Sequence, residues 1–384
     1  MGFLMRVRLL LVSLITLFAT GCRTTMWMDR DITHESRVWR QFGGAPSRAQ
    51  TSDSLLRPPL QVAWTESLSG GQAKGQPLCS GSAVIVPGLT GAIDVLDVAT
   101  GEAIGGIPFR GTLEGTPLLL DSLLVTSFSL SEVNLAAINL RTHETIWRLS
   151  TGPIDVPLLR IGARIVAVTR EGRVLCLSPG DTVLHWEART PAPIRATAAA
   201  ADSIVIVPTT GGDLFAYSVS DGRQRWRVPT GAAFTASPAI VDGVVYGVNR
   251  SGVVVAVRAV TGEVLWRRDL AIAVHAAPAA ARDGIIIACA SGDVLSLHPG
   301  TGIEQWHAAL GTVISASPLI TRAHVVAATG SGRLCLLDRA SGTIIWSEET
   351  RRRIRTTPVL CGGRLIVTDT ERGASAYISA GGMR

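Results

Sequence analysis

Tryptophan recurs in this chain at an almost constant spacing, and this repeat limits the possible folds more than any other feature. Seven of the nine tryptophans follow one another at intervals of 83, 39, 40, 40, 40 and 40 residues, and the long interval is a doubled step. These marker tryptophans are Trp64, Trp147, Trp186, Trp226, Trp266, Trp306 and Trp346. The absent marker falls at Gly105, because residues 100–105 align with residues 261–266. A fixed period of this length predicts a repeat protein whose units pack on their neighbours.

Two further residue types keep the same period. A glycine series is broken only around Val133, and its members are Gly91, Gly172, Gly212, Gly252, Gly292, Gly332 and Gly373. A proline series lacks one member near Ala198, and it comprises Pro77, Pro117, Pro157, Pro238, Pro278, Pro318 and Pro358. Because three residue types recur together, we interpret the period as structural.

Each unit has the pattern of a small antiparallel sheet. In residues 238–266, short runs rich in Val and Ile alternate with Asp-Gly, Ser-Gly and Thr-Gly pairs. Such runs favour strands, and the glycine pairs favour tight turns, so we expect about four strands in each unit. Helical repeats would show apolar residues three and four positions apart, and this pattern is missing. A unit of about 40 residues with four strands is typical of a β-propeller blade.

The markers also predict the number of blades and the way the ring closes. Eight units begin near Pro77, Pro117, Pro157, Thr197, Pro238, Pro278, Pro318 and Pro358. The eighth unit ends near Ser379 without an outer tryptophan strand, whereas residues 60–64 form such a strand without a blade before it. We therefore expect an all-β, single eight-bladed propeller of four-stranded antiparallel blades over residues 58–379, closed by its N-terminal strand. Residues 380–384 are expected to be a C-terminal tail.

The N-terminus predicts export and a lipid anchor. Residues 1–21 combine two arginines, an apolar run over residues 9–19 and small residues, as in a secretory signal peptide. The segment from Ala19 to Cys22 resembles the lipobox of bacterial lipoproteins, which predicts lipidation of Cys22; an ordinary signal peptide is the alternative. Residues 22–57 are expected to form a lipidated N-terminus and a flexible tether. In a diderm host, Arg23 predicts an outer-membrane lipoprotein that faces the periplasm.

The marker tryptophans resemble those of a known family. Each follows a Thr-Gly-Glu-like turn, and the chain contains no Trp-Asp dipeptide, which argues against WD40 repeats. The pattern resembles the tryptophan-docking motif of the bacterial pyrroloquinoline-quinone-like (PQQ-like) repeat propellers over residues 58–379. Residues 39–44 also resemble a stretch that often precedes such propellers. The resemblance implies that each marker tryptophan packs between blades. The family includes quinoprotein alcohol dehydrogenases and factors that assist the assembly of outer-membrane β-barrel proteins.

The sequence predicts no catalytic, cofactor-binding or metal site. No two cysteines are adjacent, as the quinone site of the dehydrogenases would require, and the seven histidines show no metal-ligand spacing. Cys176, Cys289 and Cys335 are expected to fill the core. Cys79 and Cys361 occupy equivalent positions in blades that meet where the ring closes. They could form a disulfide, but we favour free thiols because equivalent positions in neighbouring blades can lie too far apart.

One repeated position predicts a partner-binding surface. Nine residues after each marker stand Glu114, Arg195, Thr235, His275, Ser315 and Arg355. Inner strands of a propeller converge on the channel, so these residues could ring one mouth, and Arg351, Arg352 and Arg353 could add to a basic surface that suits an acidic partner. A solvated arginine cluster is the alternative. Ile194 and Arg195 occupy the place of a partner-contacting loop in the family's assembly factor.

The favoured function is a non-enzymatic, lipid-anchored envelope scaffold that binds proteins, with a role in the assembly of outer-membrane β-barrel proteins. A ligand-binding or sensor propeller is one alternative, and a PQQ- and calcium-dependent dehydrogenase is the other. The net charge of +6 is mild for 384 residues and gives no indication of a nucleic-acid partner.

Overall fold

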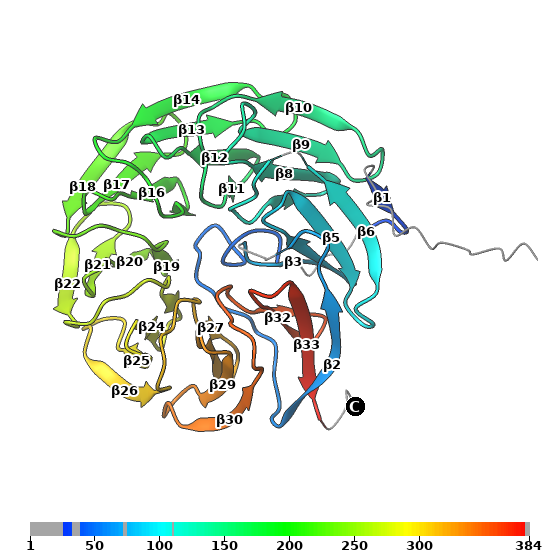
Figure 1. Ribbon diagram of the computed structural model, residues 1–384. Coiled ribbons are helices and arrows are strands. Elements are labelled where there is room, and N and C mark those ends of the chain that lie inside the picture. Colours follow the sequence, from blue (N-terminus) through cyan, green and yellow to red (C-terminus); the bar gives the residue numbers. More distant parts are fainter. Residues whose placement is uncertain (1–25, 33–38, 72–74, 110, 381–384) are drawn as a thin grey trace, which may run out of the picture.

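The eight expected blades surround a central axis in the computed structural model (Figure 1). The structure describes residues 26–32, 39–71, 75–109 and 111–380. Each blade is an antiparallel sheet whose strands lie side by side in order from the axis outward. The described residues contain strands and turns but no helix. The all-β, eight-bladed prediction is confirmed. Within the described residues, no helix has the length and apolar character needed to cross a membrane.

The first four blades have the following strands, from the innermost outward. Blade 1 contains β3 (Leu78–Ser80), β4 (Ala83–Pro87), β5 (Ala92–Asp97) and β6 (Ala103–Pro108), with β1 (Trp27–Met28) added outside β6. Blade 2 contains β7 (Leu118–Leu120), β8 (Leu123–Ser127), β9 (Leu135–Asn139) and β10 (Thr145–Leu149). Blade 3 contains β11 (Leu159–Ile161), β12 (Arg164–Val168), β13 (Arg173–Leu177) and β14 (Leu184–Arg189). Blade 4 contains β15 (Ala199–Ala201), β16 (Ile204–Pro208), β17 (Asp213–Ser218) and β18 (Gln224–Pro229).

The other four blades repeat this plan. Blade 5 contains β19 (Ala239–Val241), β20 (Val244–Val248), β21 (Val253–Arg258) and β22 (Val264–Asp269). Blade 6 contains β23 (Ala279–Ala280), β24 (Ile285–Ala288), β25 (Asp293–Leu297) and β26 (Glu304–Ala309). Blade 7 contains β27 (Leu319–Ile320), β28 (His324–Ala328), β29 (Arg333–Asp338) and β30 (Ile344–Glu349). Blade 8 contains β31 (Val359–Cys361), β32 (Arg364–Thr368), β33 (Gly373–Ser379) and, outermost, the N-terminal strand β2 (Leu60–Ser67).

The marker tryptophans join one blade to the next at every junction except that between blades 1 and 2. Trp226 on β18 donates its indole N–H to the carbonyl of Ala259 in blade 5, at 2.8 Å. Gly262 lies beneath the same ring with φ of 78°, and a Cβ there would stand 2.6 Å from Trp226 Cγ. The recurrent Thr-Gly turn therefore needs glycine both for its backbone angle and for the indole above it. Equivalent bonds run from Trp64 to Val98, Trp147 to Pro179, Trp186 to Val219, Trp266 to Pro299 and Trp306 to Arg339. Trp346 instead meets Tyr377 edge-on, with ring centroids 6.2 Å apart.

The ring closes as predicted, by pairing of the N-terminal strand β2 with the C-terminal strand β33. The expectation of free thiols at this junction is wrong, because Cys79 on β3 and Cys361 on β31 form a disulfide. Innermost strands converge on the axis, so these equivalent positions lie only 5.6 Å apart between Cα atoms, well within the reach of a disulfide. Cys176, Cys289 and Cys335 are buried free thiols, as expected of core residues.

The junction between blades 1 and 2 lacks the docking tryptophan and is built differently. Strand β1 pairs antiparallel with β6, with Met28 opposite Gly105 and Trp27 opposite Gly106. A Cβ at Gly105 would stand 2.5 Å from Met28 Sδ, so glycine is needed for this close approach. Met28 and Ile32 belong to the apolar cluster between the two blades. The N-terminal segment therefore fills part of the space that a marker tryptophan occupies elsewhere.

Candidate functional site

Residues 39–56 lie in the central channel and along its edge (Figure 1). Residues 39–57 belong to the segment for which the sequence predicts a flexible tether. This prediction is wrong here, because Trp39, Arg48, Gln50 and Leu56 are buried, and main-chain hydrogen bonds hold the segment against the blades. We call residues 39–54 the channel segment. Cys22 and residues 33–38 lie outside the described residues.

The channel segment bonds to seven of the eight blades. In blades 1 to 7, the main-chain N–H at the same position of the innermost strand donates to it, at 2.8–3.0 Å. Six of these N–H groups donate to main-chain carbonyls of the segment: Cys79 to Trp39, Leu119 to Arg40, Ala200 to Pro46, Ile240 to Ser47, Ala280 to Ala49 and Ile320 to Gln50. The seventh, that of Arg160, donates to the side-chain oxygen of Gln41. The innermost strands would otherwise direct these N–H groups at an open channel, so the segment satisfies donors that need a partner.

Arg48 anchors the segment at the axis. Its side chain is fully buried and donates to the carbonyls of Leu158 at 2.7 Å, Ala198 at 3.1 Å and Phe42. The guanidinium also lies 5.6 Å from the centroid of the Phe42 ring. Burial lowers the pKa of Arg48 to about 9, so the side chain is still charged at neutral pH. A buried charge is tolerated only when its hydrogen-bonding groups are satisfied, and these carbonyls supply that compensation.

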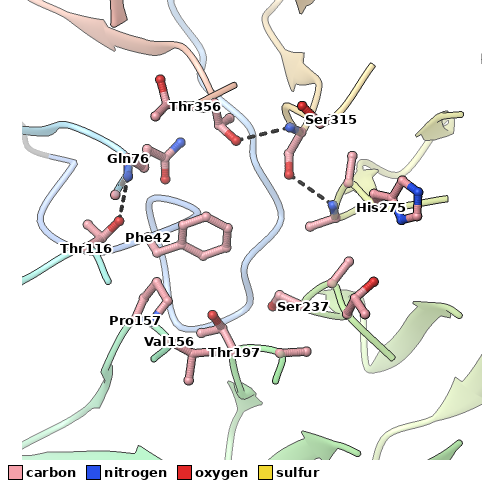
Figure 2. Close-up of a pocket in the computed structure, with 18 of the residues that line it drawn as sticks. Phe42, Gln76, Thr116, Val156, Pro157, Thr197, Ser237, His275, Ser315 and Thr356 are labelled. Carbon is pink, nitrogen blue, oxygen red and sulfur yellow. Dashed lines mark hydrogen bonds between the residues drawn. The ribbon is translucent and has the colours of Figure 1, made fainter. Parts of the chain in front are cut away.

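The mouth of the channel beyond Phe42 holds a cavity of about 210 Å³. The repeated position nine residues after the markers contributes all six predicted residues to its lining: Glu114, Arg195, Thr235, His275, Ser315 and Arg355. Figure 2 shows Phe42 in the middle of the surrounding loops, with His275 and Ser315 on one side. The structure thus brings together residues that are up to 241 positions apart in sequence, because every blade presents the same loop to the axis.

Hydroxyl groups form a second layer in the cavity wall. Thr116 accepts the main-chain N–H of Gln76 at 2.8 Å, and Ser317 accepts that of Ala277 at 3.0 Å. Thr357 accepts the N–H of Ser317 at 3.2 Å, and these bonds link neighbouring blades (Figure 2). A hydroxyl that accepts such a bond still has its own O–H to donate. With Arg195 and Arg355, these groups give the cavity many hydrogen-bond donors.

The charges at the mouth are distributed unevenly. Asp155 accepts two hydrogen bonds of 2.6 Å from Arg170 and one of 3.0 Å from Arg195, so this part of the rim is an ion-pair network. Arg352 pairs with Asp369 at 3.2 Å. Among the described residues, no carboxylate pairs with Arg351, Arg353 or Arg355, which are exposed on the loop before β31. The available positive charge is therefore concentrated on blade 8.

Two details of the predicted site differ in the structure. Ile194 is only 1% exposed and packs in the core between blades 3 and 4, so it does not belong to a partner-facing surface. Counting nine residues from Trp147 reaches Val156, which lines the cavity, whereas the neighbouring Asp155 is not a lining residue and takes part in the ion pairs of the rim. Asp155 follows the buried Ile154 as Arg195 follows the buried Ile194, so the two residues occupy corresponding positions in blades 3 and 4.

The residues at the mouth do not fit a calcium-bound quinone. Phe42 lines the cavity from the channel side, and the disulfide among the described residues joins Cys79 to Cys361 rather than adjacent cysteines. No group of three or more His, Cys, Asp or Glu that could hold a metal ion occurs in the part of the chain that the structure describes. The donor-rich lining instead suits a ligand or partner that supplies acceptors.

The fold and this channel define the class of the protein: a tryptophan-docked, eight-bladed propeller with PQQ-like repeats. Residues 170–313 and 309–383 match the family model described as outer membrane protein assembly factor BamB, and together they span more than half of the chain. The chain belongs to this family, as the marker tryptophans predicted.

Solved structures show the same fold at low sequence identity. BamB from Moraxella catarrhalis is 17% identical with a TM-score of 0.72, and the match covers 83% of this chain and 99% of that one. The quinohemoprotein alcohol dehydrogenase ADHIIG from Pseudomonas putida is 12% identical with a TM-score of 0.77, covering 92% and 82%. The computationally designed protein Ika8 is 16% identical with a TM-score of 0.73, covering 81% and 98%. No curated protein matches the sequence. Because an assembly factor, an enzyme and a designed protein share the fold, function has to be argued from the site.

Proposed function

We propose that this protein is a non-enzymatic, lipid-anchored scaffold of the bacterial envelope that binds an acidic protein partner at the channel mouth. Membership of the assembly-factor family supports a role in the assembly of outer-membrane β-barrel proteins. The observation that carries the proposal is the set of arginines Arg351, Arg353 and Arg355, which pair with no acid among the described residues and lie on the blade 8 side of the mouth. Guanidinium groups without an internal acid are available for carboxylates of a partner.

The rigid ring suits such a role. The mouth loops are held by hydrogen bonds between blades, and the channel segment closes the channel behind them. Loops that are already ordered lose little conformational entropy on binding, so they can hold a partner without a large hydrophobic interface. The proposed anchor at Cys22 is only four residues from Met26, which packs beside blade 1. The anchor would therefore be attached close to the propeller.

The test is capture of partners from the native membrane. The lipidated protein, cross-linked in intact cells and purified, should recover outer-membrane barrel-assembly proteins, and Cys22→Ser should recover far less if the anchor places it there. The double variant Arg353→Glu and Arg355→Glu should lose the partner. The matched control is Arg225→Glu, which changes an exposed arginine on the outer strand of blade 4 and should retain it. Equal recovery by both charge variants would contradict the proposed surface.

A second candidate is favoured by the cavity itself. Its hydroxyl groups and two arginines would suit a small oxyanion, and the protein would then act as a ligand-binding or sensor propeller. Citrate is a suitable probe: saturable binding by calorimetry that is lost in Arg355→Gln would favour this function. Reconstitution with PQQ and calcium should yield neither a bound chromophore nor dye-linked alcohol oxidation, and either result would overturn the non-enzymatic proposal.

A further inference from the structure

The repeat departs from its pattern twice at one place, the junction between blades 1 and 2. Gly105 replaces the docking tryptophan of blade 1. In blade 2, residues 128–134 form a longer connection between β8 and β9, where other blades use a short turn that ends in glycine. Both departures face the same junction. At five of the other junctions, an indole packs against the glycine of a turn in the next blade.

A lateral cavity of about 480 Å³ results, lying between β6 on one side and β9 and β10 on the other. Its lining is formed by Pro108, Phe109, Phe128, Ser131, Val133, Ala136, Ile138, Thr145 and Arg148. Met28 reaches the junction beside Gly105, but neither Met28 nor any other residue of β1 lines the cavity. The volume lies within the range of small-molecule sites in proteins.

The chemistry of the lining is amphipathic. Phe109 and Phe128 form a tilted aromatic pair with centroids 5.3 Å apart, and Ala136 and Ile138 continue the apolar wall. Arg148 is exposed at the rim, and no described carboxylate or carbonyl is bonded to its guanidinium. Among the described residues, the cavity therefore offers apolar contact inside and the guanidinium of Arg148 at its edge.

We propose that this cavity binds a small aliphatic carboxylate, with its chain against Phe109 and Phe128 and its carboxylate paired with Arg148. The apolar wall provides the burial of the chain, and the guanidinium is the group that holds a carboxylate with two parallel hydrogen bonds. A chain of about ten carbons fits a site of this size. The site is separate from the channel mouth, and the inference is independent of the proposed scaffold function.

Calorimetry with decanoate tests the proposal, with decanol as the neutral probe. Decanoate should bind saturably below its micelle concentration, and decanol should bind more weakly. Arg148→Gln should weaken decanoate binding about tenfold or more, because a charge-assisted hydrogen bond is lost, and should leave decanol binding unchanged. Arg225→Gln, on the outer strand of blade 4, is the matched control and should bind both probes as the unaltered chain does.

Two further variants separate a specific site from surface adsorption. Ala136→Leu narrows the cavity from within, and Thr145→Trp narrows it from an exposed position on β10 that does not disturb the core. Both should abolish binding of decanoate, and Thr145→Trp keeps the test valid if Ala136→Leu fails to fold. Absence of saturable binding, or equal decanoate affinity in Arg148→Gln or Thr145→Trp, would overturn the proposal.

Discussion

Met28 lies opposite Gly105, and Gly105 occupies the position at which the outer strands of other blades carry a docking tryptophan. The methionine comes from a segment that precedes the propeller, so an apolar side chain from outside the repeat packs against blade 1. Met28→Ala should lower the free energy of unfolding by about 2 kcal/mol, the lower end for a truncated apolar side chain, because Met28 is only partly buried. Urea unfolding measures this. An unchanged midpoint would mean that β1 does not stabilise the blade.

Loss of a docking tryptophan should be more severe. Trp226 is 8% exposed and bonded to Ala259, so Trp226→Ala should cost about 3–5 kcal/mol. Trp226→Phe retains much of the apolar contact but not the N–H donor, so its stability should lie between those of the unaltered protein and Trp226→Ala. If Trp226→Ala melts at the temperature of the unaltered protein, the indole does not join blades 4 and 5 as described.

The disulfide between Cys79 and Cys361 closes a loop with a sequence separation of 282 residues. Changing both cysteines to Ala should destabilise the protein by about 2–5 kcal/mol, because the unfolded chain is no longer constrained. Alkylation of the denatured protein followed by mass spectrometry provides the chemical check. Cys79 and Cys361 should be modified only after reduction, whereas Cys176, Cys289 and Cys335 should be modified without it.

Arg48 should be the most sensitive position of the channel segment. Arg48→Met keeps a long side chain but leaves the buried carbonyls of Leu158 and Ala198 without this donor, at a cost of about 3 kcal/mol. Arg48→Lys keeps the charge but cannot reproduce the fork of donors, so an intermediate loss is expected. Hydrogen exchange at Ala200 and Ile240 should rise in Arg48→Met, and unchanged exchange there would separate Arg48 from the order of the segment.

Acid should remove the contribution of one ion pair. Arg173 donates two hydrogen bonds of 2.9 Å to Glu187, and these bonds lower the pKa of Glu187. A lowered carboxyl pKa gives stability that is present above the unfolded value and is lost as the pH falls through the folded value. The difference in stability between the unaltered protein and Glu187→Gln should therefore be larger at pH 7 than at pH 3. An equal difference at both values contradicts this account.

The repeat made the architecture predictable because each recurring residue is required at its position for one structural role. Gly262 is required by a left-handed turn under Trp226, and the run from Leu60 has only the edge of β33 to pair with. The channel segment could not be predicted in this way. It contacts the blades mainly through its own carbonyls, which leave no side-chain pattern, and its polar composition resembles that of a linker. The disulfide could not be predicted because it depends on how closely β3 and β31 approach each other at the axis, and the spacing of the cysteines in the sequence does not give this distance.

The hydrogen bonds of the channel segment have a consequence for the order in which the protein folds. Their acceptors run from Trp39 to Gln50 in the same order as the blades they serve, from Cys79 in blade 1 to Ile320 in blade 7. A chain that leaves a ribosome or a translocon N-terminus first presents all these acceptors before any blade exists. Each blade that forms can then bond to the next acceptor along the segment, and β2 pairs with β33 only after the last blade has been made. The segment that closes the channel thus also provides one acceptor for each of blades 1 to 7, in the order in which they are synthesised.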